Sequence, residues 1–148
     1  AASLAASRGM LVLNSAGNEG DGTWKKIGFP ADAKDIIAVG ATDGKGVNTY
    51  FSSLGYSADG RVKPDAMAMG GRSAVISETN KVRFVNGTSF SCPILAGAVT
   101  CLWQAFPNKR PTEIIKAVQQ SGNFANHPNE VMGYGIPDLK KAYEILKK

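Results

Sequence analysis

The chain has 148 residues, which is enough for one domain with a hydrophobic core. Hydrophobic residues make up 43% of it and charged residues 20%, a composition typical of a globular protein and not of a disordered one. The net charge of +5 comes from scattered lysine pairs without interleaved aromatic residues. It therefore indicates a solvated surface and not a nucleic-acid-binding patch.

The first residues predict the end of a helix followed by a buried strand. Ala1 to Arg8 are typical of last helical turns, and Gly9 suits the position just after a helix. Because no Met or signal-like segment opens the sequence, we interpret the chain as a piece of a longer protein. Met10–Leu13 is a short apolar run that suits a parallel strand. At its carboxyl end, where open α/β sheets bind ligands, stands the segment Ser15–Asn18.

The middle of the chain predicts further extended segments. A second buried strand is expected at Ile36–Val39, with shorter extended pieces at 47–52 and 62–66 separated by glycine-rich turns. Ala74–Ile76 and Val82–Val85 flank a short polar segment, which predicts an antiparallel hairpin.

After this hairpin, Asn86–Phe106 predicts a turn and a central helix. Gly87 can supply turn angles that other residues avoid, and only two polar residues lie in Pro93–Phe106. A helix so apolar should be covered on several sides, and at 14 residues it is too short to span a membrane. Ser89 lies at its start, where free N–H groups and the helix dipole favour developing negative charge. From these residues alone, Ser89 or Thr88 acting merely as a helix cap is the commoner alternative.

The two cysteines are predicted to be free. Cys92 and Cys101 are nine residues apart on this helix, so they lie about 13 Å apart on opposite faces. A disulfide needs Cα atoms within about 7 Å, and we expect two buried thiols instead. An enzyme with Cys92 as its nucleophile is a further alternative, disfavoured because no base is in reach. With one histidine, the chain cannot assemble a His/Cys metal cluster.

The remaining segments predict two more helices. Pro111 opens an amphipathic helix that stops near Gly122, and a polar loop follows. Asp138 is expected to cap the last helix, whose apolar stripe begins at Leu139. Together these elements predict an α/β fold with a mostly parallel sheet flanked by helices and a small antiparallel hairpin.

Several motifs resemble those of one family. Gly87–Pro93, followed by Ala96-Gly97, resembles the nucleophile segment of the subtilisin-like serine proteases, or subtilases. Ser15–Gly20 resembles the oxyanion-asparagine motif of that family. Further segments match in the family's order: Phe29-Pro30-Ala31, Ile37–Ala41, Phe51-Ser52-Ser53, Lys63-Pro64-Asp65 and Gly133–Pro137. The resemblance runs from the first residues to about Ala142, and the chain is identified as the C-terminal half of a subtilase catalytic domain.

The resemblance implies roles for individual residues. Ser89 would be the nucleophile, and the Asn18 amide with the Ser89 backbone N–H would bind the oxyanion. The pocket for the substrate residue before the scissile bond would be lined by Ala16, Gly17, Glu19 and Gly28. Because three of these residues are small, the pocket would leave room for a large apolar side chain.

The chain also departs from the family pattern. Met69-Gly70 stands where relatives usually have Pro-Gly, which leaves the local turn open. Ile94 replaces a histidine that is structural in most relatives, whereas Pro30 occupies a position at which relatives often have a cis peptide bond.

The machinery for a serine nucleophile is incomplete in residues 1–148. A serine hydroxyl needs a base and an orienting acid, and subtilases supply both from the preceding half of the domain. Neither of those segments is present, and His127 lies in a polar loop without the family's histidine motif. We therefore expect part of a serine endopeptidase with a Ser/His/Asp triad, inactive by itself. The alternative is a non-catalytic pseudoprotease or interaction module on the same fold.

Partners and location follow from the same interpretation. The expected partners are a peptide or protein substrate and the missing N-terminal half. Without that half, the strand at Met10–Leu13 would have an unpaired edge, which favours self-association. No cofactor is expected; the parent protein could bind calcium, but no site is identifiable here. Most relatives are secreted or periplasmic, and we expect the same location.

Overall fold

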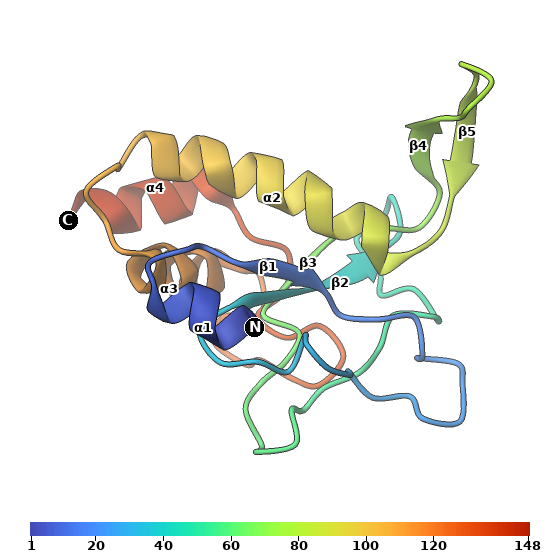
Figure 1. Ribbon diagram of the computed structural model, residues 1–148, viewed down its shortest axis with the longest axis horizontal. Coiled ribbons are helices and arrows are strands. Elements are labelled where there is room, and N and C mark those ends of the chain that lie inside the picture. The colour runs from blue at the N-terminus through green and yellow to red at the C-terminus, as the bar shows by residue number, and fades with distance from the viewer.

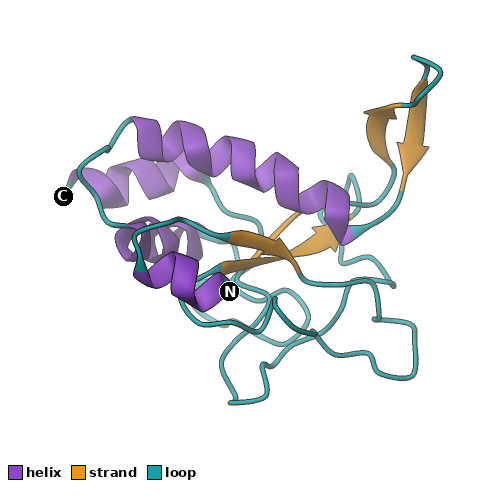
Figure 2. Ribbon diagram, in the orientation of Figure 1, coloured by secondary structure: helices purple, strands orange, loops and turns teal.

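The computed structural model describes all 148 residues and shows an α/β fold (Figure 1), which confirms the predicted fold class. The three-stranded sheet is parallel, with the strand order β1 (Leu13–Ser15), β2 (Ile37–Thr42) and β3 (Ala66–Met69). The helices are α1 (Ala2–Ser7), α2 (Thr88–Gln104), α3 (Pro111–Ser121) and α4 (Leu139–Lys147). Strands β4 (Ser73–Ile76) and β5 (Val82–Val85) form an antiparallel hairpin that projects from the body (Figure 2). None of the helices has the length and apolar character needed to cross a membrane.

Strand β2 lies at the centre of the core, and every one of its residues is buried. Successive side chains of a strand point to opposite faces. Ile37 and Val39 belong to the main cluster, which also contains Leu95, Val99 and Leu102 of α2 together with apolar residues of α3 and α4. Ala38 belongs to a smaller cluster with Ala16, Ile27 and Ala31. Helices therefore cover one face of the sheet, and loop residues cover the other.

Strand boundaries differ from the predictions. The predicted strand Met10–Leu13 is shifted to Leu13–Ser15, because pairing with β2 begins where Leu13 meets Ile37 and Met10 is 60% exposed. Residues 47–52 form no strand and make one isolated bridge to β2. The predicted segment 62–66 is not extended into the sheet until Ala66, the first residue of β3. An apolar run therefore indicates roughly where a strand lies, but it does not show which residues pair with a neighbouring strand.

Helix boundaries are closer to the predictions. Helix α3 begins at Pro111 and ends just before Gly122, as predicted. The Asp138 carboxylate caps α4 by accepting the N–H groups of Lys140 and Lys141 at 2.9 and 3.1 Å. Helix α2 begins at Thr88, so that Pro93 lies inside it.

One side of the fold is uncovered. Strand β1 pairs on one side only and is half-buried, and α1 has no buried residue. The central helix α2 packs against the sheet and against α3 and α4, as expected, but it keeps one uncovered face, on which Ile94 is 51% exposed and Gly97 is also exposed. Cys101 is exposed as well, so the prediction of two buried thiols is wrong for that residue. Both cysteines are free, as predicted.

The two thiols are expected to react at different rates. Cys101 is exposed, whereas burial raises the pKa of the half-buried Cys92 thiol and lowers its thiolate fraction near neutral pH. We expect an aromatic disulfide reagent at pH 8 to modify Cys101 roughly ten times faster than Cys92. Cys101→Ser should leave only the slow phase, and Cys92→Ser only the fast one. If both thiols of the unmodified chain reacted with the reagent in a single kinetic phase, the expected difference in rate would be wrong.

Candidate functional site

A hydrogen-bonded junction joins the carboxyl end of β1 to the start of α2. The backbone N–H and the hydroxyl of Thr88 both donate to the Asn18 Oδ1, each at 2.9 Å. The Gly17 N–H donates in turn to the Thr88 Oγ1 at 3.2 Å. These bonds hold the Asn18 side chain against the turn that leads into Ser89.

The chemistry of this junction fixes the orientation of the Asn18 amide. A backbone N–H can only donate, so the atom that faces Thr88 must be the amide oxygen. The Asn18 Nδ2 is then left with its donors free, and a Cβ added at Gly87 would lie 3.6 Å from it. The Ser89 N–H is also without a partner, as is usual in the first turn of a helix. The turn at Ser89 therefore combines an exposed hydroxyl with two unpaired N–H donors from distant parts of the chain.

The turn before Ser89 rests on the end of β3. Gly87 has a φ of 151°, in the region that favours glycine, and its N–H donates to the Gly70 carbonyl at 2.9 Å. A Cβ at Gly70 would lie 2.6 Å from the Ala41 Cβ and 2.8 Å from the Gly87 oxygen, so no larger residue fits. The departure from the family at Met69-Gly70 thus leaves a well-formed turn.

The candidate pocket residues after β1 are held by the segment 51–53. The Ser53 N–H donates to the Gly17 carbonyl at 2.9 Å, and the Glu19 N–H donates to the Ser53 Oγ at 3.0 Å. Gly17 has a φ of 107°, and Ala16 is buried beside it. The motif Phe51-Ser52-Ser53 thereby supports the segment that carries Asn18, a role that no local sequence pattern reveals.

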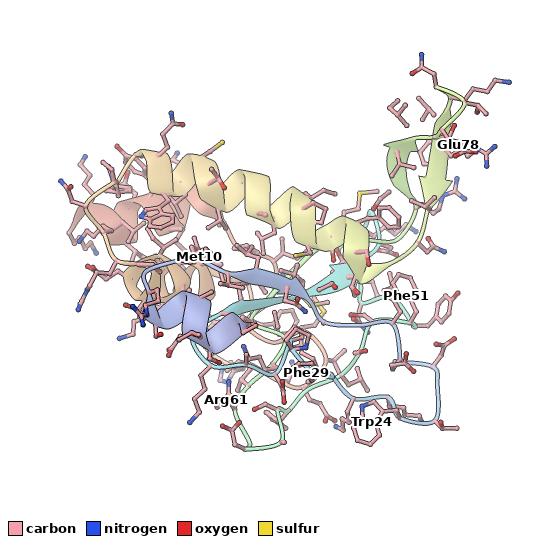
Figure 3. The ribbon with its side chains drawn as sticks, in the orientation of Figure 1. Met10, Trp24, Phe29, Phe51, Arg61 and Glu78 are labelled. Carbon is pink, nitrogen blue, oxygen red and sulfur yellow. The ribbon has the colours of Figure 1, made fainter.

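The fourth candidate pocket residue, Gly28, lies on a separate loop. Gly28 is exposed on the loop after β1, no atom lies within 4 Å of a Cβ built on it, and no hydrogen bond joins it to Asn18 or Thr88. The neighbouring Phe29 is 89% exposed and Trp24 is 67% exposed (Figure 3). The Phe29–Pro30 peptide bond is cis, as the resemblance implies.

The single histidine, His127, makes no hydrogen bond to Asn18, Thr88 or Ser89. His127 is exposed in the loop between α3 and α4, and its backbone N–H donates to the Phe124 carbonyl. No hydrogen bond links it to the turn at Ser89. Residues 1–148 thus place an exposed hydroxyl beside free N–H donors, and the chain's imidazole is not hydrogen-bonded to that hydroxyl.

A buried ion pair lies at the opposite end of the sheet. The Asp65 Oδ2 accepts from the Lys63 Nζ at 2.5 Å and from the Ala38 N–H at 2.7 Å. The Gln119 Nε2 donates to the Asp65 Oδ1 at 2.9 Å, and the two charged side chains are only 3% and 5% exposed. The motif Lys63-Pro64-Asp65 therefore joins β2, β3 and α3. It lies just before β3, and Gly70 directly follows the other end of that strand.

The sequence and the fold were compared with those of known proteins, and the matches are all to subtilisin-like proteases. The sequence matches the Subtilase family, Peptidase_S8, over residues 1–135. It is 31% identical to Subtilisin-like protease SBT6.1 of Arabidopsis thaliana over 93% of this chain, and 29% identical to Subtilisin Savinase of Lederbergia lenta over 96% of it. The chain spans 14% of the first protein and 49% of the second. The fold is similar to that of the self-cleaved protease domain of PatA, with a TM-score of 0.78 and 24% identity, covering 98% of this chain and 53% of that one.

Proposed function

The chain belongs to the subtilase family, and we propose that it is the C-terminal half of a serine endopeptidase domain that hydrolyses peptide bonds through a Ser/His/Asp triad. In this proposal Ser89 is the nucleophile, and the substrate is a peptide or protein. The missing half supplies the histidine and the aspartate, so the 148-residue chain is inactive by itself.

The observation that carries the proposal is the junction between Asn18 and Thr88. It leaves the Asn18 Nδ2 free beside the turn and the Ser89 N–H free at the start of α2. When a serine oxygen attacks a carbonyl carbon, the carbonyl oxygen becomes negatively charged, and preorganised donors stabilise that charge. The dipole of α2 acts in the same direction.

The proposal also includes a pocket for the substrate residue before the scissile bond. Ala16, Gly17 and Glu19 lie next to Asn18 on the segment tied to Ser53, and they would border the substrate residue before the scissile bond. Gly28 is exposed on the loop after β1, and in this proposal it borders the same substrate residue from that loop.

The uncovered side of the fold supports the proposal of a missing half. Strand β1 has one unpaired edge, α1 buries no residue, and Ile94 of α2 is half-exposed. Additional strands beside β1 would pair its free N–H and C=O groups. Until they do, the edge would favour self-association. A secreted or periplasmic location and calcium binding by the parent protein stay predictions.

A fluorophosphonate probe, which reacts with activated serines, tests the proposal. We expect labelling of Ser89 in a longer form that contains the preceding residues, none in its Ser89→Ala variant, and none in the 148-residue chain. Absence of labelling in the longer form would contradict a serine protease and support the non-catalytic alternative. Labelling of the short chain at Ser89 would contradict its proposed inactivity.

A further inference from the structure

The turn that carries Gly28 is hydrogen-bonded to the rest of the chain through one side chain. Residues 28–35 lead from the loop after β1 toward the start of β2, and they belong to no helix or strand. The N–H groups of Ala31 and Asp32 donate to the Gly28 carbonyl at 2.9 and 3.3 Å, which closes a tight turn. The hydrogen bonds between this segment and the remaining residues all come from the Arg61 guanidinium.

The Arg61 guanidinium binds two successive carbonyl groups of the turn. Its Nη2 donates to the Asp32 carbonyl at 2.6 Å, and its Nη1 donates to the Ala33 carbonyl at 3.3 Å. Arg61 lies on the same side of the sheet as Phe29, among the loops away from α2 (Figure 3). A guanidinium is planar and rigid, so it holds both carbonyl oxygens in one geometry. Since the Asp32 N–H donates to Gly28, the connection from the guanidinium to Gly28 passes through one residue.

The guanidinium is itself fixed by the turn 57–61. The Arg61 Nε lies 2.8 and 2.9 Å from the two Asp59 carboxylate oxygens, and the Ser57 hydroxyl donates to the Asp59 Oδ1 at 2.6 Å. The Ser57 N–H donates to the Arg61 carbonyl at 3.1 Å, which closes this turn. The hydrogen bonds from Arg61 and from Ser57 hold the pKa of the Asp59 carboxyl well below its usual range, so the ion pair stays charged at neutral pH. The donors of Arg61 are therefore in place before any substrate binds.

The start of the segment is anchored independently of Arg61. The Ile27 N–H donates to the Leu54 carbonyl at 2.8 Å, and Gly28 is the next residue. Beyond Gly28, the buried Ala31 side chain packs in the smaller apolar cluster. Without Arg61, the turn after Gly28 would be held to the rest of the chain by the packing of Ala31 and not by any hydrogen bond.

We propose that Arg61 is a positioning residue for substrate selection, which fixes the Gly28 wall of the pocket and thereby favours a large side chain before the scissile bond. This inference rests on the proposed function for the assignment of Gly28 to the pocket. A wall that is already fixed needs no ordering when the substrate binds, whereas a mobile wall loses part of the binding free energy to ordering. A large substrate side chain reaches this wall and a methyl group does not. Arg61 therefore acts on the affinity for large residues, while the hydrogen bonds between Asn18 and Thr88 stay unchanged.

Amide hydrogen exchange tests the contact of Arg61 with the turn without requiring turnover. In the 148-residue chain, Arg61→Gln should speed the exchange of the Ala31 and Ala33 N–H groups about 10-fold, because two charge-assisted hydrogen bonds to the turn are lost. The amides of β2 report global opening and should exchange at an unchanged rate. Arg61→Lys keeps a cation that can donate to one carbonyl, so its rates should lie between those of Arg61→Gln and the unmodified chain. Unchanged exchange at Ala31, or an equal increase in β2, would overturn the proposal.

Arg110→Gln is the matched control. The Arg110 Nε also donates to a carboxylate, that of Glu113 at 3.3 Å, but its guanidinium donates to no backbone carbonyl. Arg110 lies just before α3 and its side chain is 80% exposed. The substitution should leave amide exchange at Ala31 and substrate cleavage unchanged.

Cleavage by a longer form that contains both halves of the domain connects Arg61 to the pocket. The two substrates are peptide nitroanilides that differ only in having phenylalanine or alanine before the scissile bond. Arg61→Gln should raise KM for the phenylalanine substrate about 10-fold and change kcat by less than about 2-fold, because binding common to the ground state and the transition state is lost. For the alanine substrate both parameters should stay within about 2-fold. Arg61→Lys should give an intermediate KM for the phenylalanine substrate.

A purely structural role of Arg61 would give a different result. Loss of folded enzyme lowers the apparent kcat equally for both substrates, so equal losses, or a loss of kcat without a change in KM, would overturn the role of Arg61 in selection. Absence of turnover and of serine labelling in the unmodified longer form would instead refute the proposed function, and the assignment of the pocket with it, even where amide exchange shows that Arg61 holds the turn.

Discussion

Replacing Asn18 by aspartate is expected to lower kcat by a factor of about 10²–10³ in a form of the protein that contains both halves of the domain. Aspartate keeps an oxygen that can accept from the Thr88 N–H and hydroxyl, so the junction between β1 and α2 survives. It removes the Nδ2 donor and brings a negative charge to the place where an oxyanion develops. KM should change little, because the lost interaction exists only in the transition state. The magnitude is the one known for the corresponding donor of subtilisin, a member of the same family.

Asn126→Asp is the control for the added charge. Asn126 is exposed in the loop between α3 and α4 and makes no hydrogen bond through its side chain, so kcat should stay within about 2-fold. Asn18→Leu removes the acceptor as well and should also destabilise the fold, which thermal unfolding would detect. If Asn18→Asp retained full kcat with an intact fold, Asn18 would not bind the oxyanion.

Asp65→Ala is expected to destabilise the chain by about 3–5 kcal/mol. The substitution leaves the buried Lys63 ammonium without a counter-ion and removes the acceptor of the Ala38 N–H and of the Gln119 amide. Domains of this size are stable by only about 5–15 kcal/mol, so a large part of the stability would be lost. The midpoint of urea denaturation, followed by circular dichroism, measures the change.

The ion pair of Lys26 with Glu130 supplies the matched control. Its N–O distance of 2.6 Å is close to the 2.5 Å between Lys63 and Asp65, but its side chains are 47% and 43% exposed. Water screens such a pair, so Glu130→Ala should cost less than about 1 kcal/mol. Equal effects of the two substitutions would show that burial does not determine the contribution of Asp65.

Secondary structure was predictable where local chemistry decides it. Pro111 and Gly122 bound α3, Asp138 caps α4, and the polar turn between two β-branched runs forms the hairpin. Strand limits were less predictable, because pairing depends on residues distant in sequence. Met10 belongs to an apolar run and is exposed, since no neighbouring strand reaches it.

The site was predictable only in part. The hydrogen bonds between Asn18 and Thr88 join residues 70 positions apart, so no local pattern reveals them, and their expectation rests on the family resemblance. The roles of Ser53 and of Gly70 depend on close contacts between loops, which the sequence shows only as small residues in turns. Asp65 is a further case: the motif Lys63-Pro64-Asp65 is visible in the sequence, but it does not show that the Ala38 N–H and the Gln119 amide converge on the carboxylate.

Asn18 lies just after the outer strand of the sheet, so pairing at the free edge of that strand would affect the position of its side chain. Asn18 follows β1, the half-buried outer strand of the sheet, and strands of this kind open more readily than interior ones. A strand added against that outer edge would restrain the backbone three residues before the amide that faces Ser89. A strand that pairs with this edge would therefore restrain the position of the Asn18 side chain beside the turn at Ser89 without itself contacting that turn.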